Sequence, residues 1–388
     1  MPKNIVVCCD GTGNQIERNL SNVLKLFRIV SKNKTQCVYY DAGIGTIGSS
    51  DAWSRWRQNV KSVFELATGY GLDREIVGAY DFICRNHQDG DAIYLFGFSR
   101  GAYTVRAVGG MIHMIGLLPA DQLNLSQYAL RSYKQASDDN DFGIAWHFSK
   151  VSGSRPVRIK FIGVWDTVAS VLVPRPERLV PQLLTLPHTR RNPSVEVFRQ
   201  AMAIDERRRM FRLNRWIEPQ PYVKNPFDKS AAPVQQDIRQ VWFAGVHADI
   251  GGGYPETESG LSKFPLDWMV REAVSHGLKI NVAMRNHLVL GQPRIGATAV
   301  YVKPDATAAA HDSLTWGWRP LEWLPKSVKW REWPRPALAG FYLPLAEPRL
   351  IDTGQTTPII HQSVIDRMRA TSYQPENFPK NHEVESQP

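Results

Sequence analysis

The strongest constraint on the fold is a five-residue motif at positions 97–101, Gly-Phe-Ser-Arg-Gly. A short apolar run rich in strand-forming residues leads into it, and a helix-like segment follows it. A G-x-S-x-G motif in this context is typical of a tight, strained turn that presents its serine at the tip of a strand. Glycine is required on both sides, since a Cβ at Gly97 or Gly101 would collide with neighbouring backbone. The motif therefore predicts a strand–turn–helix unit with Ser99 at the carboxyl end of the strand.

Four further apolar segments are predicted to be strands, and a polar residue ends each of them. The segments are 5–9, 36–40, 157–165 and 238–246, and the residues at their ends are Asp10, Asp41, Asp166 and His247. Helical spacing alternates with these strands over 23–30, 60–66, 73–86, 103–118 and 266–276. Such alternation predicts an α/β fold with a wound, mostly parallel sheet. Because ligands bind beyond the carboxyl ends of such strands, we expect these polar residues to gather at one site.

Composition limits the partners of the chain. Its formal net charge is +10, which predicts an anionic partner such as a membrane surface, a nucleic acid or an acidic substrate. Nothing in the sequence resembles a nucleic-acid module, so we expect no nucleic acid. No apolar stretch reaches the roughly 18–20 residues that span a bilayer, and the N-terminus lacks a signal-peptide pattern. We therefore expect a cytoplasmic protein.

The order Ser99, Asp166, His247 along the chain is the order of nucleophile, acid and base in α/β-hydrolases. A serine hydroxyl needs an imidazole to take its proton, and the imidazole needs a carboxylate to orient it. The sequence thus predicts an α/β-hydrolase-like fold in which these three residues are catalytic. The oxyanion would be bound by backbone N–H groups. The predicted donors are Arg100 and either Gly11 or Thr12, with supporting roles for Asp10, Gly97, Gly101 and Asp249.

The sequence leaves several alternative functions and site residues open. Asp10 ends a strand before a Gly-rich turn and could serve a phosphoryl hydrolase, or join Asp249 in a metal site. Asp249 is the second choice for the acid, and His361 is the second choice for the base or else caps a helix. The chain could also be a non-catalytic interaction module that keeps the fold. We expect no metal and no cofactor, because no metal-ligand cluster supports one.

The chain is predicted to divide into three parts. Residues 1–280 would form the catalytic domain, with a cap inserted at about 172–236, where prolines and positive charge cluster around one predicted helix, 194–211. Residues 281–370 would form a Trp-rich extension that packs on this domain. The polar, Pro-rich residues 371–388 would be a loosely ordered tail.

Four blocks of sequence together resemble a known family. They are residues 9–14, 96–102, 163–168 and 245–254, and the resemblance extends from about residue 3 to about residue 275. The family is a widespread microbial group of α/β-hydrolases, and its best-known members are the catalytic modules of type VI secretion phospholipase effectors. The resemblance implies hydrolysis of phospholipid acyl esters, of phospholipase A type, by Ser99, Asp166 and His247. It also implies export without a signal peptide and raises the question of secretion or immunity partners.

A stretch rich in tryptophan, lysine and arginine, Trp316 to Arg335, permits two interpretations. Tryptophan favours the membrane interface, and lysine and arginine pair with anionic headgroups, which predicts peripheral contact with an anionic membrane. The same tryptophans could instead pack against the rest of the protein, with their indole N–H groups hydrogen-bonded.

Overall fold

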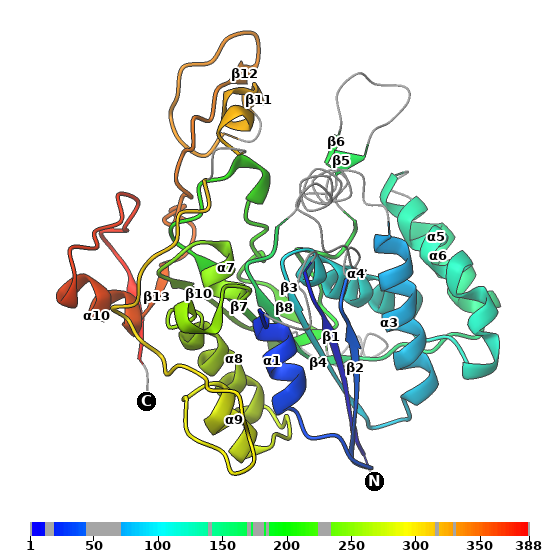
Figure 1. Ribbon diagram of the computed structural model, residues 1–388. Coiled ribbons are helices and arrows are strands. Elements are labelled where there is room, and N and C mark those ends of the chain that lie inside the picture. The colour runs from blue at the N-terminus through cyan, green and yellow to red at the C-terminus, as the bar shows by residue number, and fades with distance from the viewer. Residues whose placement is uncertain are drawn as a thin grey trace, which may run out of the picture.

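The computed structural model describes most of the chain, and Figure 1 shows its arrangement. The described residues are 2–11, 19–43, 71–138, 142–168, 172–173, 182–183, 186–223, 234–314, 318–328 and 331–386. The helix predicted over 60–66 and the predicted oxyanion donor Thr12 lie outside these ranges.

The core is an eight-stranded sheet in which every pair of neighbours is parallel. Its order is β14-β13-β10-β7-β4-β3-β1-β2. The strands are β1 Asn4–Cys9, β2 Gln36–Asp41, β3 Ala92–Phe98, β4 Ile159–Trp165, β7 Val195–Ala203, β10 Asp237–Phe243, β13 Ile359–His361 and β14 Glu383–Glu385. This sheet confirms the predicted wound, parallel α/β architecture.

Helices cover both faces of the sheet, as a parallel sheet requires. On one face, α3 (Leu72–Asn86), α4 (Arg100–Ile115) and α5 (Ser126–Asp138) share an apolar cluster with the odd-numbered side chains of β1. On the other face, α1 (Asn22–Ile29) and α8 (Lys263–Ser275) share a second cluster with the even-numbered ones. The remaining helices are α6 Phe142–Val151, α7 His247–Gly251, α9 Val282–Leu288 and α10 Gln362–Ala370. Alternate burial on two faces explains the continuous apolar runs in the sequence.

Shorter elements connect or extend these layers. The 3₁₀ turns are η1 Ala120–Leu125, η2 Arg209–Phe211, η3 Glu256–Glu258 and η4 Arg319–Trp323. In the described ranges, three two-stranded pairings lie outside the main sheet: β5 Leu172–Val173 with β6 Gln182–Leu183, β8 Pro221–Tyr222 with β9 Val234–Gln235, and β11 Lys326–Ser327 with β12 Phe341–Tyr342.

The strand order reverses at β1. The chain passes from β1 to β2 on one side and then returns to place β3 on the other side of β1. In open α/β sheets a crevice forms beyond the carboxyl ends of the strands at such a point. Asp10 follows β1 and Ser99 follows β3, so the topology places both residues at this reversal.

The helix predicted over residues 194–211 is wrong. Residues 195–203 form β7, a central strand between β4 and β10, and this part of the range 172–236 is therefore sheet core rather than an inserted cap. Both faces of β7 are buried, and a strand of this kind is normally recognised by a continuous apolar run. The polar residues of β7 interrupt that run. Arg199 pairs with Asp237 and Glu272, and Gln200 accepts from Arg106. Burial of these polar groups is possible because each has a partner.

The C-terminal residues are also more ordered than predicted. Strand β14, within the predicted loose tail, pairs with β13 at the edge of the sheet. In the same tail, Tyr373 donates to Asp205, and Asn377 donates to the carbonyl oxygen of Ile204. The sheet is therefore not complete at residue 280, because its last two strands come from 359–361 and 383–385.

The glycines of the 97–101 motif lie where a side chain cannot fit. A Cβ at Gly97 would overlap the backbone of Gly101, and a Cβ at Gly101 would overlap the carbonyl oxygens of Cys9 and Asp10. Helix α4 thus begins in direct backbone contact with the end of β1. Gly109, further along the same helix, has only ordinary van der Waals distances around an added Cβ.

We expect Gly101→Ala to lower the free energy of unfolding by roughly 1–3 kcal/mol, because the backbone atoms it would meet cannot move aside cheaply. Chemical denaturation of the full chain measures this loss. Gly109→Ala is the matched control, and it should leave stability unchanged or raise it, since alanine is the better helix former. Equal denaturation midpoints for the two variants would contradict the close approach of α4 to β1.

Candidate active site

Ser99 occupies a strained turn between β3 and α4. Its φ of 57° and ψ of −118° place it in a backbone region that a non-glycine residue rarely adopts. Its N–H donates to the carbonyl oxygen of Trp165 at the end of β4, at 3.1 Å, which ties the turn to the neighbouring strand. Gly11 lies against it, since a Cβ on Gly11 would be 3.3 Å from Ser99 Cβ. The strain is of the kind found where a fold presents a functional side chain.

Asp166 and His247 lie in direct contact, as the predicted acid and base should. The distance from His247 Nδ1 to Asp166 Oδ2 is 2.5 Å. Asp166 follows β4 and His247, the first residue of α7, follows β10, so the pair meets at the carboxyl edge across the end of β7, which lies between these two strands. Asp166 Oδ1 also accepts from the N–H of Ala203 at 3.0 Å, which fixes the carboxylate against the end of β7.

The His247 ring is enclosed by aromatic side chains. The ring of Phe98, which precedes Ser99, lies 4.6 Å from it, and that of Phe211 lies 4.8 Å from it, centroid to centroid. Burial lowers the pKa of the imidazole below its ordinary value, although Asp166 acts in the opposite direction. The lowered pKa favours the neutral ring, the form that the predicted role of general base requires. Among the described residues, no hydrogen bond joins Ser99 Oγ to this ring; such bonds often tighten only when substrate binds.

Arg349 completes the surroundings of the carboxylate, and sequence reasoning missed it. Its Nη1 lies 2.5 Å from Asp166 Oδ1 and its Nη2 lies 3.0 Å from Asp166 Oδ2. It also donates to the carbonyl oxygens of Ala203 and Phe211. Burial alone would raise the pKa of Asp166, but Arg349 and His247 hold it well below its ordinary value. No local signal marks Arg349, which lies 183 positions from Asp166.

The predicted oxyanion donors have different surroundings. Arg100 is the first residue of α4, where backbone N–H groups have no acceptor within the helix. The N–H of Gly11 instead donates to Asp10 Oδ1 at 2.7 Å. Asp10 Oδ2 accepts from Tyr40 and Ser21, so protein donors engage both oxygens of this buried carboxylate. Asp10 thus holds the segment after β1 in place, and this environment does not favour an Asp10 nucleophile.

Neither of the second choices contacts the Asp166–His247 pair. Asp249 accepts from the N–H of Val246 at 3.0 Å and bonds to His311 at 2.7 Å, so it supports the start of α7. His361 Nδ1 accepts from the N–H of Ser363 and caps α10. His311 was not identified from the sequence; it bridges Asp249 to Glu258 and stacks on Tyr254.

The described residues contain no group of three or more histidine, cysteine, aspartate or glutamate side chains that could hold a metal ion. In the same ranges, every helix is too short or too polar to cross a membrane.

Comparison with known proteins gives matches of three kinds. Residues 3–272 match the family described as "T6SS, Phospholipase effector Tle1-like, catalytic domain". The uncharacterized protein YEL023C of Saccharomyces cerevisiae is 32% identical over 240 residues, which cover 58% of this chain and 34% of that protein. Two solved structures are similar at low sequence identity. One is an uncharacterized protein from Pseudomonas aeruginosa, with 17% identity and a TM-score of 0.39, covering 72% of this chain and 46% of that chain.

The other solved structure is the Tle1 effector bound to the VgrG spike from the type 6 secretion system, with 19% identity and a TM-score of 0.30, covering 67% of this chain and 53% of that chain. This chain therefore spans about a third of the yeast relative and about half of the two solved chains. The family match covers well over half of the 388 residues and confirms the resemblance drawn from the sequence. The chain belongs to the family of Tle1-like phospholipase effector catalytic domains of the type VI secretion system.

Proposed function

We propose that the protein is a serine hydrolase that cleaves carboxylic esters through an acyl-enzyme. The observation that carries this proposal is the 2.5 Å hydrogen bond between His247 Nδ1 and Asp166 Oδ2, next to the strained turn that presents Ser99. Phe98 links the two features, because it precedes Ser99 in the chain and its ring packs on the His247 ring. A serine, an imidazole and a carboxylate at the carboxyl edge of one sheet are the groups that acyl transfer requires.

In the proposed reaction, Ser99 Oγ attacks the ester carbonyl carbon while His247 Nε2 takes the hydroxyl proton. The carbonyl oxygen becomes an oxyanion, and the Arg100 N–H at the start of α4 is the proposed donor to it. When the intermediate collapses, His247 returns the proton to the departing alcohol and the acyl group stays on Ser99. A water molecule, deprotonated by His247, then attacks the acyl carbon. The bond from this carbon to Ser99 Oγ breaks, the acid leaves, and His247 returns the proton to Ser99 Oγ. Asp166 keeps the Nδ1 proton in place and stabilises the imidazolium through both steps.

We propose phospholipid acyl esters as the substrates, in agreement with the family to which the chain belongs. The solved Tle1 effector is bound to a VgrG spike, and we extend type VI export and a spike partner to this chain as proposals. An immunity partner would follow if the released enzyme were toxic to its producer. Export and these partners are proposed for the whole protein, whereas the proposed ester chemistry needs only residues of this chain.

Peripheral contact with an anionic membrane is a further part of the proposal. Figure 1 shows β11 and β12 projecting beyond the body of the protein. Of the fifteen large apolar side chains exposed in the described ranges, six belong to residues 323–345: Trp323, Leu324, Leu338, Phe341, Leu343 and Leu345. The basic residues Lys326, Arg331 and Arg335 lie in the same segment. Exposed apolar side chains among cations suit the surface of an anionic bilayer.

The tryptophans divide between the two interpretations. Trp318 packs edge-on against Phe211, and the indole N–H of Trp333 donates to the carbonyl oxygen of Pro348 at 2.6 Å. Trp323, by contrast, is 66% exposed. Trp316 and Trp330 lie outside the described residues. Trp318 and Trp333 pack against other parts of the protein, as the packing interpretation predicts. Trp323 is exposed and could contact a membrane.

We expect Ser99→Ala to lower kcat on a phospholipid or a p-nitrophenyl ester by on the order of 10⁴–10⁶-fold, since the nucleophile is lost. A fluorophosphonate should label the wild-type protein and not the variant. Ser126→Ala is the matched control and should keep both activity and labelling. Ser126 is also buried, but it begins α5 and its hydroxyl donates to Asp81 of α3. Labelling of the Ser99→Ala protein, or no labelling of the wild type, would refute the serine-hydrolase proposal.

The acid limb of the kcat/KM profile should lie below pH 6.5, because burial lowers the pKa of His247 and the neutral ring is the active form. Arg349→Met removes a positive charge beside the Asp166–His247 pair, so we expect the limb to move to higher pH and kcat to fall. Arg349→Lys keeps the charge and should move it less. Enzyme kinetics from pH 4 to 9 gives both quantities.

Arg367→Met is the control for this experiment. Arg367 and Arg349 are equally buried, at 6% exposed, but Arg367 donates to the carbonyl oxygens of Ala306 and Ala308. Its loss should reduce stability without moving the acid limb. An identical pH profile in the Arg349→Met enzyme would contradict the proposed effect of Arg349 on the pair.

The double variant Trp323→Ser, Leu338→Ser should bind vesicles of anionic lipid at least about tenfold more weakly, because each side chain would bury apolar surface in the bilayer. Co-sedimentation measures the binding, and added salt should weaken it for both proteins. The control is the double variant Ile295→Ser, Val300→Ser, at two exposed apolar residues outside the segment. Equal vesicle binding by wild type and double variant would rule out this surface.

A further inference from the structure

Helix α7, which carries His247, lies between two stretches of backbone that glycine makes flexible. Gly245 precedes the helix with a φ of 113°, and Gly252 follows it with a φ of 79°. Glycine adopts this region freely, so the backbone on either side does little to fix the direction of so short a helix. Side-chain contacts must therefore hold the imidazole against Asp166.

Two buried carboxylates hold the end of α7 that carries His247. Asp249 Oδ2 accepts from the N–H of Val246 at 3.0 Å, and Glu206 Oε2 accepts from the N–H of His247 at 3.2 Å. These N–H groups belong to the start of a helix, where the helix itself offers them no acceptor. The two carboxylates therefore fix the first turn of α7, provided that they are themselves fixed.

The second oxygen of each carboxylate meets one short segment, residues 311–313. Asp249 Oδ1 lies 2.7 Å from His311 Nδ1, and Glu206 Oε1 accepts from Ser313 Oγ at 3.0 Å. Each carboxylate thus joins α7 to this segment, with one oxygen directed to each. Residues 311–313 are called the brace.

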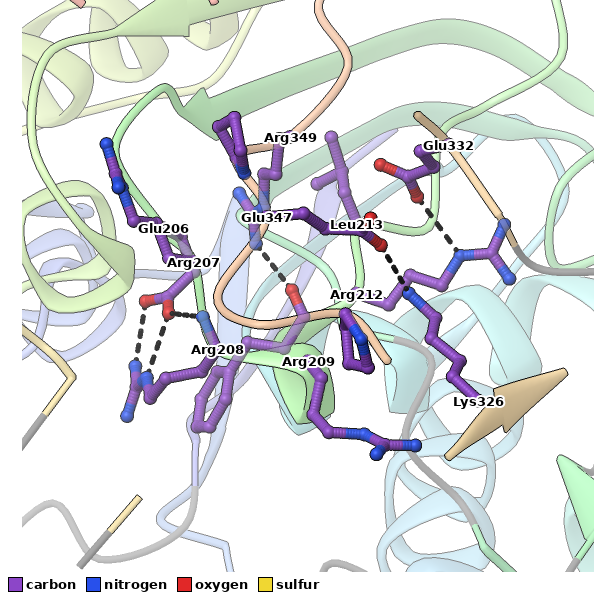
Figure 2. A pocket seen from close by; sticks show the side chains of 13 residues that line it. Glu206, Arg207, Arg208, Arg209, Arg212, Leu213, Lys326, Glu332, Glu347 and Arg349 are labelled. Atoms are coloured by element: carbon purple, nitrogen blue, oxygen red, sulfur yellow. Dashed lines mark hydrogen bonds and ion pairs between the residues drawn. The ribbon is translucent and has the colours of Figure 1, made fainter. Parts of the chain in front are cut away.

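Other side chains support both contacts of the brace. His311 Nε2 lies 3.2 Å from Glu258 Oε2, and the His311 ring stacks on that of Tyr254 with the two centroids 3.5 Å apart. Arg208 donates to both oxygens of Glu206, at 2.9 and 2.8 Å, in the wall of the pocket that Figure 2 shows. The positions of His311 and Glu206 are therefore each determined from more than one side.

The chain that leads to the brace is attached to the core of the protein. The N–H of Val302 donates to Glu256 Oε1 at 3.1 Å. Glu256 in turn pairs with Lys25 of α1 at 3.1 Å and with Lys263 of α8 at 2.5 Å, and both lysine side chains are fully buried. The brace therefore approaches α7 from a segment that is tied to two helices of the core.

We propose that the brace positions His247 for catalysis, with His311 and Ser313 as positioning residues. The inference rests on the proposed function, because it explains how the proposed general base is kept in line with Asp166. Each of the two residues acts through the carboxylate that holds α7, without touching the ester. A misplacement of about 1 Å can cost on the order of 100-fold in rate, so loss of both contacts lowers the rate of chemistry and leaves ester binding unchanged.

The double variant His311→Ala, Ser313→Ala should lose roughly 10- to 100-fold in kcat on a p-nitrophenyl ester, with KM unchanged. The rate of labelling by a fluorophosphonate should fall by a similar factor, since that reaction also needs His247. His311→Asn keeps a donor near the position of Nδ1 and should retain most of the kcat that His311→Ala loses. An unchanged kcat in the double variant, or a rise in KM alone, would overturn the proposal.

His276→Ala is the matched control. The side chain of His276 is 22% exposed, against 16% for His311, and it also lies beside a carboxylate, at 3.3 Å from Asp237. Asp237 begins β10, whereas α7 follows the other end of that strand, so His276→Ala should leave kcat unchanged. An equal fall in kcat in this control would trace the effect to general stability and overturn the positioning role.

A second measurement does not depend on turnover. The Nδ1 proton of His247, held at the 2.5 Å contact with Asp166, should give a proton NMR line far downfield that His247→Gln removes. The double variant should broaden or lose this line, because the ring moves and the proton exchanges with water, while His276→Ala keeps it. An unchanged line in the double variant overturns the proposal. If the wild type neither cleaves esters nor reacts with a fluorophosphonate, the proposed ester chemistry fails, while the NMR line still decides the role of the brace.

Discussion

Arg349 and Asp166 form an ion pair in which both side chains are almost fully buried. Removing two charges from water is costly, and it is offset only where the geometry is good and the remaining donors are used. Here the guanidinium also meets two carbonyl oxygens, and the carboxylate also meets His247 and the N–H of Ala203. The orientation of His247 therefore depends on residues from β4, β7, α7 and the segment before β13. Loss of Arg349 or of Asp166 would leave the other charge buried without its ionic partner.

The parallel sheet explains why these distant residues meet. Neighbouring strands end in register, since Phe98 pairs with Trp165, Trp165 with Ala201 and Ala203 with Phe243. The residues that follow each strand are then close to one another, and two such segments supply Ser99 and Asp166. The reversal of strand order at β1 opens the edge at the same place. Topology alone brings the strand ends together, while the ion pair determines how the side chains point.

Local patterns were enough to predict much of this arrangement. The Ser99 turn, the strands before Asp166 and His247 and the parallel architecture follow from glycine spacing and apolar runs. Arg349 could not be predicted, because its partner is far away in sequence and no motif surrounds it. Strand β7 was missed because its buried polar residues are paired with side chains from other elements. The spacing of apolar residues along the sequence gives no information about such partners. The same reason applies to β14, a polar edge strand whose Glu385 accepts from the indole N–H of Trp268 and pairs with Arg239.

The fold brings part of the protein's positive charge next to exposed apolar side chains. A surplus of ten positive charges says nothing of where an anion binds. In the structure, the exposed apolar residues of 323–345 share their segment with the cations Lys326, Arg331 and Arg335. A membrane that receives the apolar side chains would present its phosphates at the depth of the basic ones. The acyl esters of a phospholipid lie just beneath its phosphate, so the proposed membrane contact would keep the proposed ester substrate beside the protein. The cations of this segment would then act together with its exposed apolar side chains, because a bilayer presents its phosphates and its apolar interior at neighbouring depths.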